Sequence, residues 1–493
     1  MWRWQTVFGL MAMVLSVCVD LTAAQEQPGG PAFQGLYNPK YVLDMYHAGL
    51  HRLKAKAHTD ECKARIEFEY MKHMRVVSEE RPSPFEDVFF HSQCERTWSE
   101  TRPLMPVGMR NVPSRPPVIP PPLTNNATKK HPDDIKILYV MLVHDHADFT
   151  ERLLRALDEP QHTFVVHVDL KARAVHEQLH KFATDKQGGI LGIGGKKSMQ
   201  GALHIMTEGR QSVTWGGFSV VNATLAAMRF AWDNKVEFDY MIDISGTTYP
   251  LVDNKAIRTA LAQRPGFTYM DVHDKPSRPA AEMWHSYVEC DDHMHRISRL
   301  ASLRGMNMYV GSQWFALPWH VVHWFLHNLL PIDYINYAKR VVVADEHYFA
   351  TLFKNSPYCD ELVSQNLLFV LFDKWENQKT KEREDRDKRK CLHPDPDHCG
   401  RSPTTLTLDY KRLLQTSQHL FARKFDPRVA DSTAMLEEID KWRENPDNRM
   451  EGAAQDFMIR QESQEHADAE AASAGDESAV SGTISSSCLS MDS

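Results

Sequence analysis

Two apolar stretches, ILYVMLVH at residues 137–144 and TFVVHVD at residues 163–169, decide the fold of this chain. Each is an almost continuous run of apolar residues, which is typical of a strand buried on both faces of a sheet. Residues 148–157, between them, have apolar side chains at helical spacing. A strand, a helix and a second strand in this order predict the beginning of an α/β fold.

The same alternation continues downstream. We expect a third strand at 212–215, a helix at 218–232, a strand at 240–244, a helix at 254–263 capped by Asp253, and a strand at 267–272. Strands that alternate with helices indicate an α/β fold around a mostly parallel sheet. Ligands of such sheets bind past the carboxyl ends of the strands, so residues there are the first candidates for a site.

The flanking segments differ from this central part. Residues 1–24 have the layout of a secretory signal peptide, or of a short type II membrane anchor, and both place the rest of the chain in the lumen. Residues 25–101 are expected to form a helical stem and 102–133 a proline-rich linker. A large α/β domain over 134–430, then a helix and a disordered acidic tail over 431–493, complete the expected organisation.

Composition limits the function classes. The 493 residues are 42% hydrophobic and 25% charged, which is ordinary for a globular protein. The net charge of −8 argues against general nucleic-acid binding, which favours a basic face. Apart from Cys18 and Cys488, the cysteines form an even set, which permits disulfides in an oxidising compartment.

Polar and aromatic residues follow two of the predicted strands. Asp169 closes the second strand, where a carboxylate can accept hydrogen bonds from a ribose or a base, although an Asp at this place is often a helix cap. Trp215-Gly216-Gly217 follows the predicted third strand. Its glycines let the backbone approach a ligand and its Trp can pack on a base or sugar, although a tight turn with a core Trp has the same pattern.

Two further stretches offer an acid and a pair of cations. In ADEHYFATLF at 344–353, we expect Asp345 to cap a helix whose first turn holds Glu346. The helix dipole there favours an ionised carboxylate, which a general base requires. In FARKF at 421–425, Arg423 and Lys424 suit a diphosphate. A plain capping acid and a basic surface pair are the alternative interpretations.

Metal binding is not favoured by the sequence. The Asp-x-Asp at 395–397 lies in a proline-rich loop between Cys391 and Cys399, away from any predicted strand end. Successive side chains of the HDH run at 144–146 would alternate and point apart if the first strand continued through it. We therefore expect neither a metal nor another cofactor.

Taken together in their order along the chain, these motifs resemble one family, the core-2/I-branching β-1,6-N-acetylglucosaminyltransferases and peptide O-xylosyltransferases. The other motifs that carry the resemblance are DISGTTYPL (243–251), ECDDHMHR (289–296), GSQWF (311–315), NSPYCDEL (355–362) and CGRSP (399–403). The resemblance covers residues 136–425, and TWGG, ECDDHMHR and FARKF are closer to the xylosyltransferase branch.

The resemblance implies a GT-A fold and an inverting, metal-independent transfer from a UDP-sugar. Glu346 matches the catalytic base, and Arg423 with Lys424 matches the pair of cations that holds the diphosphate. The remaining positions that match donor-binding residues are Leu142, Asp169, Val213, Thr214, Trp215, Gln313, Trp314 and Ser402. The resemblance also implies a Cys391–Cys399 disulfide and a bond between Cys359 and the N-terminal part, with Cys94 or Cys62 as its partner.

Three departures from the family pattern stand out. Thr248 replaces an Asp, Arg389 and Arg401 replace a second disulfide, and Gln313 replaces an acid expected to face the donor sugar. An amide both accepts and donates hydrogen bonds, so the donor stays open between UDP-xylose and UDP-N-acetylglucosamine.

The expected acceptor is a protein serine or a glycan hydroxyl, and the expected location is the Golgi lumen, with the chain membrane-anchored or secreted. The alternative is a catalytically silent glycan- or nucleotide-binding protein on the same fold. The oligomeric state is not predicted.

Overall fold

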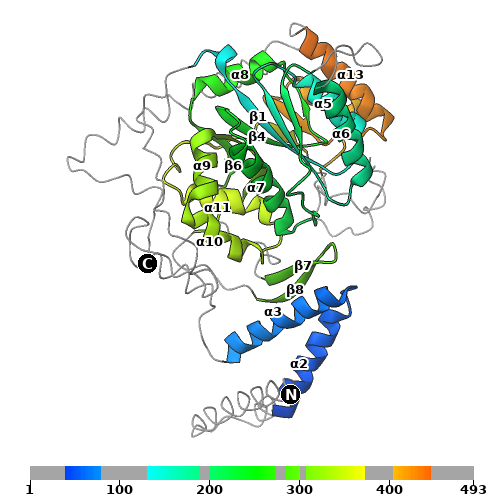
Figure 1. The fold of residues 1–493 in the computed structure, drawn as a ribbon, viewed down its shortest axis with the longest axis vertical. Helices are drawn as coiled ribbons and strands as arrows, with labels where there is room; N and C mark the ends of the chain where they lie inside the picture. The colour runs from blue at the N-terminus through cyan, green and yellow to red at the C-terminus, as the bar shows by residue number, and fades with distance from the viewer. Residues whose placement is uncertain are drawn as a thin grey trace, which may run out of the picture.

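A seven-stranded sheet forms the centre of the molecule, with helices on both faces (Figure 1). The structure is a computed structural model that describes residues 39–78, 130–187, 199–273, 285–299, 307–371 and 403–445. In sheet order the strands are β10 (Leu362–Val363), β6 (Thr268–Val272), β9 (Gly311–Pro318), β4 (Tyr240–Ser245), β1 (Ile137–Val143), β2 (Thr163–Val168) and β3 (Ala202–Ile205).

The direction of the strands determines which loops meet. β1 is parallel to β2 and β4, and β3 is parallel to β2. Only β9 is antiparallel to its neighbours among the described strands of this sheet, and Gly311 at its start pairs with Val272 at the end of β6. The beginning of β9 therefore lies at the same edge as the carboxyl ends of β1, β2, β4 and β6.

Side chains of the central strands pack on both faces of the sheet. Tyr139 and Met141 of β1 join one buried cluster, and Leu138 and Val140 join the other. The first cluster includes residues of α5 (Ala147–Ala156), α6 (Arg173–Gln187), α8 (Asn254–Gln263) and α13 (Ala430–Glu444). The second includes residues of α7 (Phe218–Asp233), α9 (Trp319–His327), α10 (Leu329–Ala338) and α11 (Tyr348–Lys354). The apolar strand at 137–143 is thus buried on both faces, as its composition predicts.

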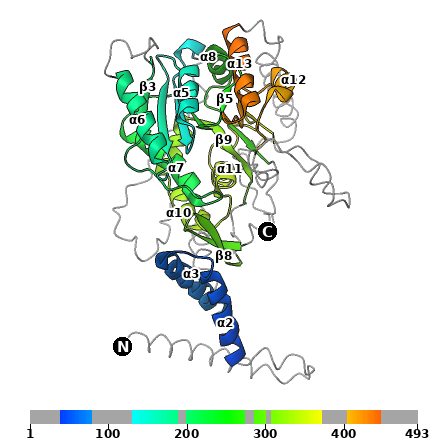
Figure 2. The same cartoon turned by 90° about the vertical axis from the view of Figure 1, so that its right-hand side faces the viewer.

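Two smaller units are attached to this body. A three-stranded sheet joins β11 (Leu368–Val370), β12 (Phe421–Arg423) and β5 (Tyr249–Pro250), beside the short helix α12 (Lys411–Gln415). The N-terminal helices α2 (Pro39–Lys54) and α3 (Asp60–Ser78) lie against a hairpin of β7 (His285–Cys290) and β8 (His293–Arg299), on one side of the body (Figure 2). A disulfide between Cys62 and Cys290 joins α3 to this hairpin.

Most of the predicted elements are confirmed, including the helix at 254–263, where Asp253 Oδ1 accepts a hydrogen bond from Ala256 N at 2.8 Å. The prediction of a third strand at 212–215 is wrong, because these residues form a loop and the third strand, β3, is Ala202–Ile205. This loop is held at the end of β2: Gln211 N donates to Nε2 of His167 in β2, and Val213 N donates to Asp169, the residue after it.

Of the two partners predicted for Cys359, Cys62 is wrong, because it is bonded to Cys290, while Cys359 is itself disulfide-bonded. The predictions for residues 1–24, most of the linker, Cys94, Cys391–Cys399 and the tail beyond residue 445 lie outside the described residues. Within the described part, no helix is both long and apolar enough to cross a membrane.

Candidate functional site

A cavity of about 1810 Å³ opens at the edge of the sheet where the strand ends meet. Its walls include the ends of β1, β2, β4 and β6, the beginning of β9, and residues of β11 and β12. Of the positions predicted from the sequence, it brings together Leu142, Asp169, Val213, Trp215, Gln313, Trp314, Glu346, Arg423 and Lys424. Residues far apart in the sequence thus share one site, at the place that the topology favours.

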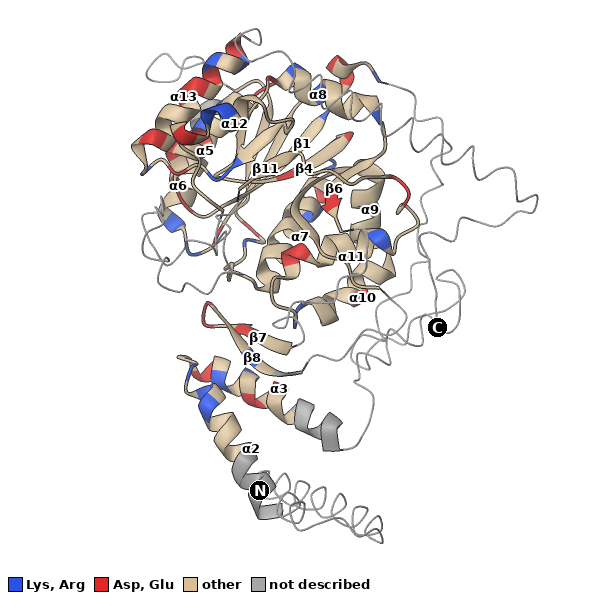
Figure 3. Cartoon of the chain, turned by 180° about the vertical axis from the view of Figure 1, so that it is seen from behind, with Lys and Arg blue, Asp and Glu red and all other residues tan. Residues whose placement is uncertain are grey.

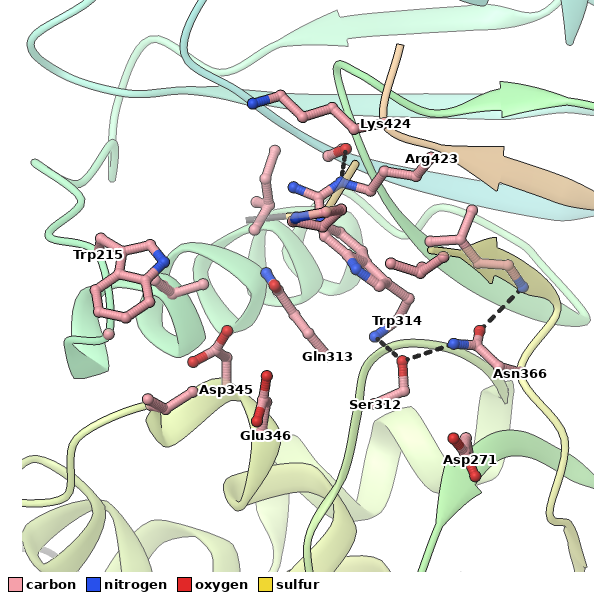
Figure 4. Close-up of a pocket in the computed structure, with 18 of the residues that line it drawn as sticks. Trp215, Asp271, Ser312, Gln313, Trp314, Asp345, Glu346, Asn366, Arg423 and Lys424 are labelled. Atoms are coloured by element: carbon pink, nitrogen blue, oxygen red, sulfur yellow. Dashed lines mark hydrogen bonds between the residues drawn. The ribbon is translucent and has the colours of Figure 1, made fainter. Parts of the chain in front are cut away.

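Glu346 and its neighbour Asp345 approach this cavity on a 3-10 turn, Ala344–Glu346 (Figure 4). The prediction that Asp345 caps the helix is wrong, because α11 begins at Tyr348 and Asp345 makes no side-chain cap. The preceding residue Val343 has a left-handed backbone with φ 57°, which turns the chain before the helix starts. Both carboxylates therefore lie in the cavity wall.

Burial, rather than a helix dipole, controls the charge of these two acids. Burial and, to a smaller extent, the neighbouring Asp345 together raise the pKa of Glu346 to about 7. Burial also raises the pKa of Asp345 to about 6, against the opposing effect of Arg423. A carboxylate with a pKa near neutrality is well matched to accepting a proton in a reaction at neutral pH.

Arg423 and Lys424 reach the cavity from the end of β12. Arg423 Nε donates to Ser245 Oγ at 3.0 Å, and the guanidinium lies 4.7 Å from the centre of the Trp314 ring. Burial lowers the pKa of Arg423 to about 10, so the group remains charged at neutral pH, and burial also lowers the pKa of Lys424. Two half-buried cations with a fixed guanidinium form a site suited to a polyanion.

The hydroxyls around Ser245 support Arg423. Ser245 Oγ lies 3.0 Å from Thr247 Oγ1 and 3.1 Å from Thr248 Oγ1. Thr248, one of the departures from the family pattern, is fully buried and does not line the cavity. Its hydroxyl belongs to the support of Arg423 and does not contact the space available to a ligand.

Asp169 is not a helix cap, because α6 begins at Arg173, and its carboxylate holds two backbone N–H groups instead. Its Oδ1 accepts from Lys171 N at 2.8 Å, as a turn-forming Asp does, and its Oδ2 accepts from Val213 N at 3.3 Å. The residue also lines the cavity beside Leu142 and Trp215. Trp215 is 75% exposed, so its ring is not the core Trp of a tight turn and is available to a ligand.

The beginning of β9 places Gln313 between Arg423 and the acids Asp345 and Glu346 (Figure 4). Next to it, Ser312 Oγ accepts hydrogen bonds from Trp314 N and from Asn366 Nδ2, both at 3.0 Å. These two bonds hold the strand start in place. A neutral amide therefore occupies a position that both the cations and the acids approach.

Two predicted residues are not found in the cavity wall. Thr214 is buried, and its N–H donates to Ser219 Oγ at 2.8 Å. Ser402 lies outside the described residues. The cavity also contains residues that sequence reasoning did not single out as ligand-binding: Asp271, His273, Ser312, Asp345 and Asn366. Their only sequence signal is proximity to a strand end or to a motif, and such a signal is weak.

A cluster of potential metal ligands lies outside the cavity wall. Among the described residues, one group of three potential ligands lies close together, namely Cys62, Cys290 and His295. Its two sulfurs are already joined in the disulfide and lie away from the cavity wall. Metal independence therefore remains a prediction.

Together, the fold and the site define a class: α/β proteins with a ligand cavity at the carboxyl ends of a mostly parallel sheet, equipped with paired cations and a carboxylate of raised pKa. Comparison with known families is more specific. The family model described as "Core-2/I-Branching enzyme" matches residues 137–394, which is more than half of the chain. The chain belongs to this family.

Individual relatives are similar over the same region. The chain is 26% identical over 308 residues to xylosyltransferase 1 of Rattus norvegicus, an alignment that covers 60% of this chain and 34% of the relative. It is 25% identical over 328 residues to xylosyltransferase oxt of Drosophila pseudoobscura pseudoobscura, covering 63% and 34%. The chain thus spans about a third of the length of these relatives.

Among solved structures, the apo form of mouse xyloside xylosyltransferase 1 matches 59% of this chain and 99% of that chain at 9% identity, with a TM-score of 0.27. A superposition of this quality carries no argument about function.

Proposed function

We propose that this protein is a GT-A-type, inverting glycosyltransferase that moves xylose or N-acetylglucosamine from a UDP-sugar to a protein serine or a glycan hydroxyl, without a metal. The observation that carries this proposal is the presence of Glu346, Arg423 and Lys424 in the wall of one cavity. Such a transfer needs a carboxylate whose pKa lies near neutrality and a fixed pair of cations.

In the proposed reaction, Glu346 accepts the proton of the acceptor hydroxyl as that oxygen attacks the anomeric carbon. The new carbon–oxygen bond forms on the face opposite the leaving group, and the bond to the diphosphate breaks with its electron pair on UDP. Arg423 and Lys424 stabilise the negative charge that develops on the diphosphate. Trp215, Asp169, Val213 and Leu142 surround the nucleotide.

A secretory location fits this proposal. The disulfide between Cys62 and Cys290 is expected in an oxidising compartment. We propose the Golgi lumen, reached through an N-terminal signal peptide or a short type II anchor.

A donor panel tests the function directly. UDP release is measured with UDP-xylose, UDP-N-acetylglucosamine and UDP-glucuronic acid, against peptide and glycan acceptors, with EDTA present throughout. Turnover of one of the first two donors in EDTA is the expected result. Turnover only after manganese is added would contradict the metal-free mechanism, and no turnover of any donor would favour a silent binding protein.

A further inference from the structure

The β7–β8 hairpin lies between the N-terminal helices and the central body (Figure 3), and residues Glu289–Asp292 at its turn contact both. Cys290 is bonded to Cys62 of α3. Asp291 accepts hydrogen bonds from His58 N at 2.6 Å and from Thr59 N at 2.8 Å, just before α3 begins. One covalent bond and one capping carboxylate thus fix the N-terminal helices to this turn.

Asp292, the next residue, contacts the wall of the cavity. Its Oδ1 lies 2.7 Å from Lys171 Nζ. The same ammonium donates to the carbonyl of Val213 at 2.7 Å and lies 3.9 Å from Asp169. Lys171, Val213 and Asp169 all line the cavity. A single lysine therefore connects the hairpin to the loop that follows β3.

Glu289 supports the same region from another side. Its Oε2 accepts from Ser219 N at 3.1 Å at the start of α7, where Gly217 at the N-cap offers no side chain. A Cβ on Gly217 would lie 2.3 Å from the Glu289 carboxyl carbon, so a larger residue would displace this carboxylate from its place at Ser219 N. Ser219 Oγ in turn holds Thr214 N, next to Trp215. The glycine of TWGG and the glutamate of ECDD are thus structural partners.

From these contacts we propose that Asp292 is a positioning residue for the nucleotide-base end of the donor site, acting through Lys171 on Val213 and Asp169, and that α2 and α3 hold the turn that carries it. The proposal rests on the proposed function. It implies that the N-terminal helices contribute to donor binding, because they hold the turn that positions the donor site.

Asp292→Asn tests the proposal because it removes the charge and keeps the size of the side chain. The matched control is Asp60→Asn. Asp60 forms a comparable exposed ion pair with Lys63, at 3.1 Å, and neither residue lines the cavity. The probes are UDP, which occupies both ends of the site, and inorganic pyrophosphate, which needs only the cations. Calorimetry gives the dissociation constant of each probe for each variant.

We expect Asp292→Asn to weaken UDP binding about three- to fivefold, the size typical of an exposed ion pair, while pyrophosphate binding stays unchanged. Asp292→Glu is expected to restore most of the loss, and Asp60→Asn to bind UDP like the unaltered chain. Equal weakening of UDP and pyrophosphate, or equal UDP binding by both Asn variants, would overturn the proposal.

Amide hydrogen exchange separates this proposal from the proposed function. In Asp292→Asn without nucleotide, the peptide spanning 208–218 is expected to exchange several-fold faster, and in Asp60→Asn at the unaltered rate. Failure of the unaltered chain to bind UDP would count against the proposed function. An unchanged exchange rate in Asp292→Asn would count against the role of Asp292.

Discussion

Arg423 lies with its guanidinium 4.7 Å from the centre of the Trp314 ring, and the two residues come from strands of different sheets. The stacking and the bond to Ser245 Oγ leave the guanidinium little conformational freedom before a ligand arrives. A preorganised cation loses less entropy on binding than a flexible one, so this relationship makes Arg423 the stronger of the two proposed diphosphate ligands.

Replacement of Arg423 by Ala is therefore expected to weaken UDP binding about 10- to 100-fold, the effect of losing hydrogen bonds between charged groups. The loss should be the same with EDTA and with manganese. Calorimetry under both conditions measures it, and Arg412→Ala, on the exposed surface of α12, serves as the control. Full recovery of UDP binding with manganese would show that a metal, and not Arg423, neutralises the diphosphate.

The raised pKa of Glu346 predicts a pH dependence of the rate. Only the deprotonated carboxylate can accept a proton, so kcat is expected to rise through a midpoint near pH 7 and to fall about tenfold per unit below it. Asp345→Asn removes a like charge, which lowers the pKa of Glu346 and moves this midpoint to lower pH. Initial rates at saturating donor between pH 5 and 9 test both statements. A midpoint that moves upward in Asp345→Asn would refute the assigned coupling.

Gln313 is expected to influence the choice of donor sugar. Gln313→Asp supplies a carboxylate that accepts two hydroxyl hydrogen bonds, as the family pattern has it, in place of an amide. We expect the ratio of kcat/KM for UDP-xylose to that for UDP-N-acetylglucosamine to rise about tenfold or more, since a polar group matched to a substrate hydroxyl discriminates strongly. Steady-state kinetics with both donors measure the ratio. An unchanged ratio would remove Gln313 from the sugar subsite.

Asp243 on β4 predicts a pH dependence of stability. It is buried, its Oδ2 lies 3.3 Å from Thr224 Oγ1, and burial raises its pKa well above the usual value of 3.8. The unfolded chain loses this proton first as pH rises, so the contribution of Asp243 to stability is full below about pH 4 and declines toward the raised pKa.

Asp243→Asn stays neutral at every pH. Its free energy of unfolding, relative to that of the unaltered chain, is therefore expected to increase between pH 4 and pH 8. Urea midpoints of both proteins at several pH values give this difference, in which the titration of other groups cancels. A difference that stays constant, or that decreases with pH, would contradict the assignment of a protonated Asp243.

The parts of the fold that were predictable from the sequence are those with strong local patterns. The apolar runs of β1 and β2 and the cap Asp253 needed no information about distant residues. The strand predicted at 212–215 failed because Gln211 N donates to His167 and Val213 N to Asp169, and no local pattern reports such contacts.

The site, too, has features that local sequence patterns indicate and features that only long-range contacts determine. Glu346, Arg423 and Lys424 were candidates from residue type and from the family resemblance, but their shared cavity depends on the antiparallel insertion of β9. The burial that sets the pKa of Glu346 and the pairing of Cys62 with Cys290 arise from residues far apart in the chain. The spacing of residues along the sequence indicates neither this burial nor this pairing.

The comparison of Glu346→Gln with the unaltered chain tests the central claim most directly. The substitution keeps the size of the side chain and removes its capacity to take a proton. We expect a fall in kcat of about 10²- to 10⁴-fold, as for the loss of a general base, with a UDP dissociation constant within about twofold of the unaltered value. Equal losses of turnover and of UDP binding, or turnover that is retained, would contradict the assignment of Glu346 as the base.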